Sequence, residues 1–116
     1  MSAFTILQQI ALSFPETTEE PHFENTSFRV KKKIFATFDY THNRACLKFS
    51  EIDQSVFSCI DKNVIYPVPN KWGKQGWTFV QLENLDREIL VDALTTAYCT
   101  VAPKKLAEQV RPSEEK

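Results

Sequence analysis

Apolar residues recur at helical spacing near both ends of the chain. The first such segment covers residues 3–14, and its apolar side chains share one face: Phe4, Leu7, Ile10, Ala11 and Phe14. Ser2 can cap the start of this helix, and Pro15 ends it. The polar, acidic residues 16–20 that follow are predicted to form a loop.

A long final helix carries the clearest helical pattern. Its apolar stripe consists of Ile89, Leu90, Ala93, Leu94, Ala97, Tyr98 and Val101. Asn84 or Asp86 can cap its start, and Pro103 ends or kinks it. We expect Lys104 and Lys105 near its C-terminus, where positive charge suits the helix dipole.

Between these helices the pattern alternates with period two, which is typical of half-buried strands. Residues 27–30, 34–38 and 45–49 alternate in this way, with tight connections predicted at 31–33 and 40–44. Two more strands are predicted at residues 64–66 and 77–82.

A short helix is predicted to begin at Ser50, with Asp53 completing a weak capping box. Its expected inner face consists of Ile52, Val56 and Cys59 with Ile60.

The order of elements is therefore α-β-β-β-α-β-β-α. Hairpin connections favour an α+β fold with two layers, an antiparallel sheet and helices packed on one face. We expect one domain over residues 1–110 and a flexible tail over 111–116, because 116 residues suit a single core.

One segment concentrates the scarce residue types. Residues 66–77 hold both tryptophans, both glycines and two of the six prolines. Gly73 and Gly76 are where a turn with positive φ is most easily made, and Pro67 and Pro69 stiffen the approach. These residue types predict that the backbone of this loop has a constrained conformation with tight turns.

Composition narrows the class of protein. No apolar run approaches the roughly 20 residues that cross a bilayer, and no secretory signal is evident. Cys46, Cys59 and Cys99 are odd in number and widely spaced, which favours reduced thiols and a cytoplasmic protein. We expect no membrane association.

The net charge of −1 hides an uneven distribution. Residues 29–74 carry nine bases and four acids, whereas 1–28 carry four acids and no base. A basic middle segment can meet phosphate or an acidic protein, or it can be a solubilising face. The pI of about 6.1 lies well below that of dedicated DNA-binding domains, which often exceed about 9.

The motifs HFENTSFRV, KIFATF, CLKFS, YPVPNKWGKQGWTFVQL and AYCTVAPKKL occur in this order between residues 22 and 106. In this respect the chain resembles the MmcQ/YjbR-like proteins over nearly its whole length. The resemblance implies a compact α+β fold. Members of this family carry a DNA-binding label, in which hairpins of the sheet are likened to paired wings. No enzymatic activity is established for the family. One departure is Lys31-Lys32, where many relatives have a turn that contains glycine.

Nucleic acid is the first candidate ligand, bound weakly and without sequence specificity. The candidate phosphate contacts are basic residues on two hairpins: Arg29, Lys31, Lys32, Lys33, Arg44 and Lys48. If the two hairpins are adjacent, these charges form one strip. The alternative is that such lysines only prevent unwanted sheet pairing.

The tryptophan loop is the second candidate. Trp72 and Trp77 beside Lys71 and Lys74 can stack bases, as in proteins that bind single strands. The spacing of Gly73 and Gly76 matches a KH-type backbone clamp only weakly, and both tryptophans can instead be core anchors.

The sequence contains little that indicates metal binding or catalysis. His22 and His42 lie in separate segments without a Cys/His pair at zinc-ligand spacing. No serine lies in a nucleophile elbow, no Gly-rich phosphate loop occurs, and Cys99 is expected to be an inert packing thiol. We therefore expect no catalysis and no cofactor.

The alternative function is a protein-interaction module that uses the sheet face or the loop over residues 72–77. Its partner would be an acidic protein or a second copy.

Overall fold

The computed structural model describes residues 2–83 and 85–111. The chain forms a six-stranded antiparallel sheet in the order β1-β2-β3-β4-β6-β5. The strands are β1 (Thr17–His22), β2 (Asn25–Val30), β3 (Lys33–Asp39), β4 (Arg44–Lys48), β5 (Ile65–Pro67) and β6 (Trp77–Gln81). The helices are α1 (Ala3–Leu12), α2 (Glu51–Ser58), α3 (Lys71–Lys74), α4 (Arg87–Val101) and α5 (Lys104–Val110).

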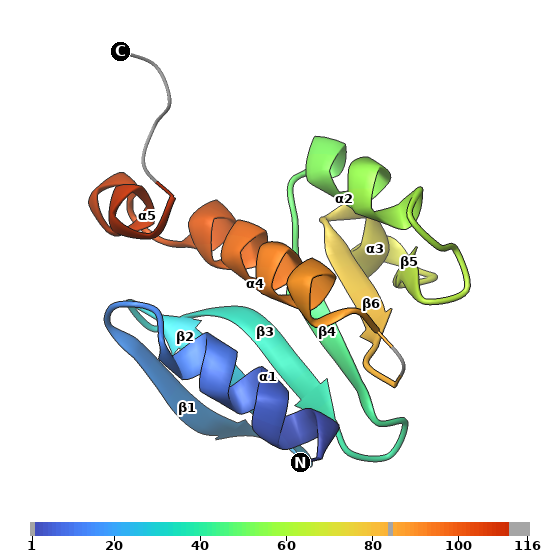
Figure 1. Ribbon diagram of the computed structural model, residues 1–116, viewed down its shortest axis with the longest axis horizontal. Coiled ribbons are helices and arrows are strands. Elements are labelled where there is room, and N and C mark those ends of the chain that lie inside the picture. The colour runs from blue at the N-terminus through green and yellow to red at the C-terminus, as the bar shows by residue number, and fades with distance from the viewer. Residues whose placement is uncertain (1, 84, 112–116) are drawn as a thin grey trace.

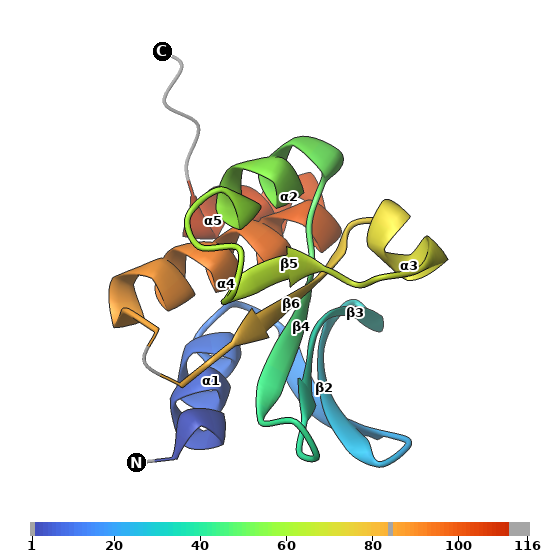
Figure 2. The same cartoon turned by 90° about the vertical axis from the view of Figure 1, so that its right-hand side faces the viewer.

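The predicted α+β class is confirmed, and the long helices lie on one face of the sheet (Figure 1). Helix α4 packs on β3 and β4, α1 lies beside α4 and β1, and α5 packs against α4. Viewed from the side, α1 and α4 lie on one side of the sheet and the short helix α3 projects from the other (Figure 2). No helix in the described part of the chain combines the length and the apolar character that crossing a membrane requires.

The core fills the space between the sheet and the long helices. Tyr98 is fully buried at its centre, with its ring against Phe14 and Phe35 at centroid distances of 4.9 and 5.5 Å. Its hydroxyl donates a hydrogen bond of 2.8 Å to the carbonyl oxygen of Pro15, so the polar end of this large side chain is satisfied. Burial is also the main reason why the pKa of Tyr98 is raised.

Several sequence-based predictions need correction. The loop predicted over residues 16–20 is largely the edge strand β1, which is exposed along most of its length and so needs no apolar pattern. The loop over residues 66–77 contains the unpredicted helix α3. Lys104 and Lys105 begin the separate helix α5 instead of ending α4, because the chain is extended at Ala102 and Pro103. Asp86 caps α4, whereas Asn84 lies outside the described residues.

The largest correction concerns the inner face of α2. Phe57 is its buried residue, whereas Ile52, Val56, Cys59 and Ile60 are exposed. The rotation of this helix is set by Phe57, which stacks on Phe49 at 4.9 Å, and by Gln54. The Gln54 amide donates hydrogen bonds to the carbonyl oxygens of Gly73 and Trp77 and to the Thr78 hydroxyl.

Turns with positive φ form mostly at residues other than glycine. Lys31 and Lys32, at φ of 52° and 69°, make the two-residue connection between β2 and β3, as in a type I′ turn. Phe23, at 60°, starts the two-residue turn between β1 and β2. Of the two glycines, Gly76 has the expected positive φ of 107°, whereas Gly73 is helical and serves a close backbone approach.

Candidate functional site

The face of the sheet opposite the long helices, here called the uncovered face, forms the wall of a groove. The cavity has a volume of about 520 Å³ and an open mouth. We call it the aromatic groove, and it is lined by His22, Asn25, Ile34, Thr37, Asp39, Cys46, Val68, Trp72, Trp77 and Phe79. Residues from the five strands β1, β2, β3, β4 and β6, from the loop before α3 and from α3 itself therefore meet at one site.

Strand alternation explains why these side chains share a face. In β6, Thr78 and Val80 are buried toward the helices, so Trp77 and Phe79 point the other way. The antiparallel register places Cys46 of β4 beside Phe79 and Lys48 beside Trp77. The same register places Tyr66 of β5 on the other side of Phe79. The uncovered face at this end of the sheet thus carries an aromatic patch, and its Trp77 and Phe79 line the groove.

Trp72 forms one rim of the groove and is 50% exposed. The Asn70 side chain caps α3 by accepting a hydrogen bond of 2.8 Å from the Trp72 N–H. A Cβ added to Gly73 would lie 1.9 Å from the carbonyl oxygen of Val68, so only glycine lets this helix approach the preceding chain. The ammonium group of Lys71 lies 5.8 Å from the Trp72 ring centroid.

Trp77 forms a second tryptophan–lysine pair. The Lys48 ammonium group lies 5.5 Å from its ring centroid and donates a hydrogen bond to the carbonyl oxygen of Gln75. Trp77 is half-buried, so neither tryptophan is a fully buried core anchor.

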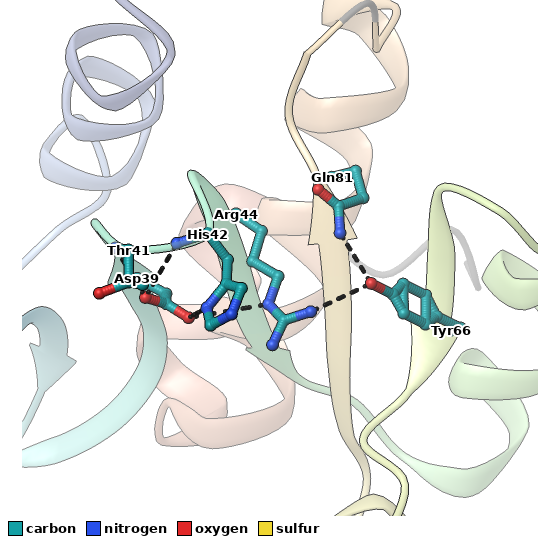
Figure 3. Close-up of polar contacts among 6 residues, drawn as sticks. All are labelled: Asp39, Thr41, His42, Arg44, Tyr66 and Gln81. Carbon is teal, nitrogen blue, oxygen red and sulfur yellow. Dashed lines mark hydrogen bonds and ion pairs between the residues drawn. The ribbon is translucent and has the colours of Figure 1, made fainter.

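Arg44 lies at the opposite end of β4 from Lys48, in a polar cluster (Figure 3). Its guanidinium carbon lies 3.6 Å from the centroid of Phe79, and its Nη1 donates a hydrogen bond of 3.2 Å to the Tyr66 hydroxyl. Arg44 Nε is 3.7 Å from a carboxylate oxygen of Asp39. With its side chain only 19% exposed, this arginine supports the uncovered face more than it offers a charge to solvent.

Asp39 organises the turn between β3 and β4. One carboxylate oxygen accepts hydrogen bonds from the N–H groups of Thr41 and His42, and the other lies 2.8 Å from Nδ1 of His42. Burial alone would raise the pKa of Asp39, but the hydrogen bonds and charge of His42, with the Thr41 N–H, outweigh burial and lower this pKa from its ordinary value. An ionised carboxylate therefore stands at one end of the groove.

The basic residues between β2 and β3 lie at the turn. Lys31, Lys32 and Lys33 are all exposed, and Lys31 pairs with Glu16 at 2.8 Å. Arg29 projects from β2 and donates a hydrogen bond of 2.9 Å to the Ser27 hydroxyl. The hairpins are adjacent because β3 pairs with β4, but Arg44 and Lys48 lie at opposite ends of β4.

The structure thus brings together only some of the residues singled out in the sequence. Trp72 and Trp77 both line the groove, Lys71 and Lys48 lie near their rings, and Lys74 lies at the end of the same short helix as Trp72. Sequence reasoning missed residues on the groove wall or in its polar end: His22, Asn25, Ile34, Thr37, Asp39, Cys46, Tyr66, Val68 and Phe79. The alternation of Phe79 with buried Thr78 and Val80 was the available signal for one of them.

The groove offers little for covalent or metal chemistry. Burial raises the pKa of the Cys46 thiol to about 12, so this thiol stays protonated near neutral pH. Across residues 2–83 and 85–111, no group of three or more His, Cys, Asp or Glu side chains is arranged to hold a metal ion. The arrangement fits the binding of a flat or apolar ligand.

Comparisons with known proteins place the chain in a family. The YjbR family model matches residues 12–100. The chain belongs to the YjbR family. Its fold is similar to the crystal structure of the Deinococcus radiodurans protein DR2400, which has a DUF419 domain. The TM-score is 0.78 at 22% identity, over 99% of this chain and 94% of that one. Among curated proteins, none matches the chain. The YjbR assignment confirms the family resemblance, and the structural neighbour supports the fold alone.

Proposed function

We propose that this YjbR-family protein binds single-stranded DNA or RNA weakly and without reading its sequence, by stacking bases in the aromatic groove. The observation that carries the proposal is that both tryptophans line one open groove and each has a lysine ammonium group near its ring, Lys71 beside Trp72 and Lys48 beside Trp77. Flat aromatic faces beside positive charge suit any base and any phosphate, which is how single strands are bound without sequence preference.

Duplex DNA fits this surface less well. The guanidinium of Arg44 is stacked on Phe79 and lies near Asp39, and Lys31 pairs with Glu16. Two of the predicted phosphate contacts therefore already have partners within the protein. A groove walled by indole and phenyl rings accepts unstacked bases, which a duplex does not expose.

The test is fluorescence anisotropy with a labelled single-stranded oligonucleotide and its duplex, at about 50 and 200 mM salt. We expect the single strand to bind more tightly and to lose affinity as salt rises. Trp72→Ala should weaken binding by roughly 5- to 100-fold, because one stacked base contributes about 1–3 kcal/mol.

Paired lysine variants separate the groove from general charge. Lys71→Gln with Lys74→Gln should weaken binding and lower the salt slope by up to about 1.4, whereas Lys104→Gln with Lys105→Gln on α5 removes the same charge elsewhere and should change little. Reversal of Lys31, Lys32 and Lys33 to Glu tests the basic turn. If that reversal abolishes binding while Trp72→Ala has no effect, the proposed groove is wrong.

The alternative is a protein-interaction module on the same face. It is favoured by Phe23, which is 93% exposed on the turn between β1 and β2, next to the groove residue His22. An exposed aromatic ring of this kind is typical of an anchor that enters a partner's pocket. Failure of both nucleic acids to bind would favour this function over the first.

A further inference from the structure

Phe23 combines an exposed ring with a strained backbone. Its side chain is 93% exposed at the first position of the two-residue turn between β1 and β2. Its φ is 60°, in a region that glycine adopts freely and that a phenylalanine adopts only at a conformational cost. Phe23 therefore stabilises neither the core nor the turn. Strain and exposure at one position indicate that this ring serves binding.

The ring of Phe23 stays outside the groove of its own chain. His22 and Asn25, on either side of the turn, line the aromatic groove, but Phe23 does not. A two-residue turn leaves no slack that could bend the ring back over the sheet. The ring lies beside His22 instead, at a centroid distance of 4.8 Å. Only another molecule can therefore cover it.

The charges around Phe23 indicate which kind of surface it fits. Glu24 is the next residue in the turn, and Glu20 lies on the same side of β1 as His22. Both carboxylates are exposed, and within the described part of the chain neither forms an ion pair. Arg29 is the one arginine or lysine among residues 1–30 and offsets only part of their four acids. An acidic tip with an aromatic ring is repelled by phosphate and suits a cationic pocket with aromatic walls.

The aromatic groove is such a pocket. Its volume of about 520 Å³ is more than one phenyl ring fills. Trp72 and Trp77 line it and offer flat faces on which another ring can pack.

The charges around the groove are positive in excess, opposite to those of the tip. Three lysines lie on α3 beside Trp72 or pair in register with Trp77: Lys48, Lys71 and Lys74. Across residues 2–83 and 85–111 none of the three forms an ion pair. The acids that line the groove or the cavity next to it are Asp39, which faces Arg44 at 3.7 Å, and Glu51. Four bases thus stand against two acids.

We propose that the protein forms a weak two-fold dimer in which Phe23 of each copy enters the aromatic groove of the other. The turn and the groove are neighbours on one face, since His22 and Asn25 belong to both. One two-fold axis between turn and groove therefore sets each ring into the facing groove, and both contacts form together. The same axis brings Glu24 of each copy toward the lysines of the other. A second copy satisfies both halves of this surface at once, whereas an unrelated partner would satisfy one.

The area of the two contacts sets the strength of the dimer. A buried phenylalanine removes about 150–250 Å² from solvent. With a similar area of groove wall covered, two contacts bury roughly 600–1,000 Å² in total, which is the size of weak and transient interfaces. We expect a dissociation constant of about 10–500 µM. The groove cannot hold this ring and a nucleic-acid base together, so the two compete; only this competition rests on the proposed function.

Sedimentation velocity from about 10 µM to about 1 mM tests the dimer. The wild type should change from monomer to dimer over this range, and Phe23→Gly should associate at least tenfold more weakly. Glycine suits the φ of 60°, so this variant should melt at or above the temperature of the wild type. Ile52→Ala removes another exposed apolar side chain, on α2, and should dimerise like the wild type. A wild type that stays monomeric at about 1 mM overturns the proposal, as does a dimer that survives Phe23→Gly.

The indole N–H signals of Trp72 and Trp77 test where the ring goes. In the wild type these signals should shift as the protein concentration rises over the same range, and in Phe23→Gly they should stay in place. A dimer that forms without shifting either indole overturns the groove contact.

Competition separates the dimer from the proposed function. A single-stranded oligonucleotide that saturates the groove should dissociate the dimer, and a dimer that persists under saturation overturns the proposal. An oligonucleotide that does not bind at all counts against the proposed function alone, because Phe23→Gly and the indole shifts still decide the dimer.

Discussion

The two faces of the sheet are built from alternate residues of the same strands, yet the aromatic rings on the two faces differ in burial and in their neighbours. On the covered face, Phe28 and Phe35 have no exposed surface and pack in the apolar core with Tyr98 of α4, whose hydroxyl is satisfied by the carbonyl oxygen of Pro15. On the uncovered face, Trp77 and Phe79 carry the cations of Lys48 and Arg44 over their rings and remain half-buried. Complete burial stabilises the fold, whereas half-buried rings with charged neighbours leave a surface that can bind.

Removing the central ring of the covered face should have the largest effect on stability. Tyr98→Ala deletes a fully buried ring and orphans the carbonyl oxygen of Pro15, and we expect a loss of about 3–5 kcal/mol in the free energy of unfolding. Trp72→Ala, on the uncovered face, should cost no more than about half as much because its ring is half exposed. Urea denaturation of both variants measures the difference, and equal losses would remove the contrast between the faces.

The second largest effect on stability is expected where the tryptophan loop joins the sheet. A Cβ at Gly76 would lie 1.9 Å from the carbonyl oxygen of Phe49, and the φ of 107° suits only glycine. We expect Gly76→Ala to lower stability by about 2–4 kcal/mol. Gln75→Ala is the neighbouring control and should change stability by less than about 1 kcal/mol. A Gly76→Ala protein as stable as the wild type would show that the loop does not need this close approach.

The polar cluster of the uncovered face should contribute less, and its contribution should depend on pH. Asp39→Asn removes the negative charge beside Arg44 and His42, and we expect a loss of about 1–3 kcal/mol at pH 7. Folding lowers the pKa of Asp39 from its ordinary value. The stabilisation is therefore present above the pKa of the unfolded chain and is lost as the pH falls through the lower pKa of the folded protein.

Chemical denaturation from pH 7 down to about pH 2 can follow this loss. Wild type and Asp39→Asn should converge in stability at the acidic end, because the protonated carboxyl resembles the amide. A difference that stays constant over the whole range would contradict the assigned role of the charge.

The smallest effect is expected at the turn between β2 and β3, outside both faces. Lys32 has a φ of 69°, so Lys32→Gly should raise stability by roughly 0.5–1 kcal/mol. Lys33→Gly, in the first residue of β3, should instead lower it by about 0.5–1 kcal/mol. Thermal denaturation distinguishes the two signs. Unchanged oligonucleotide binding by Lys32→Gly would place this turn outside the binding surface.

The sequence predicted the fold better than it predicted the site. Period-two and helical patterns located β2, β3, β4, β6, α1 and α4, because each of these elements buries one regular face. They missed β1, an exposed edge strand, and they assigned the wrong inner face to α2. There, one stacked phenylalanine and the hydrogen bonds of Gln54 outweigh a regular aliphatic stripe.

The candidate site was harder to predict because it depends on long-range strand pairing. Trp72, Trp77, Lys48 and Lys71 were identified as candidates from their residue types, but the register that brings Phe79 between Cys46 and Tyr66 has no local signal. Nor does the sequence indicate that Arg44 is drawn onto Phe79 while Lys71 stays beside the exposed Trp72.

The most direct test of the account is an NMR titration that follows the two indole N–H signals, since Trp72 and Trp77 are the two tryptophans of the chain. Trp72→Phe assigns them. On addition of a single-stranded oligonucleotide, both signals should shift in a saturable and salt-sensitive manner, with amides of β4 and β6 shifting alongside. Saturable binding that leaves both indole signals in place and shifts the amides of residues 31–33 instead would contradict the central claim that the uncovered aromatic face is the binding surface.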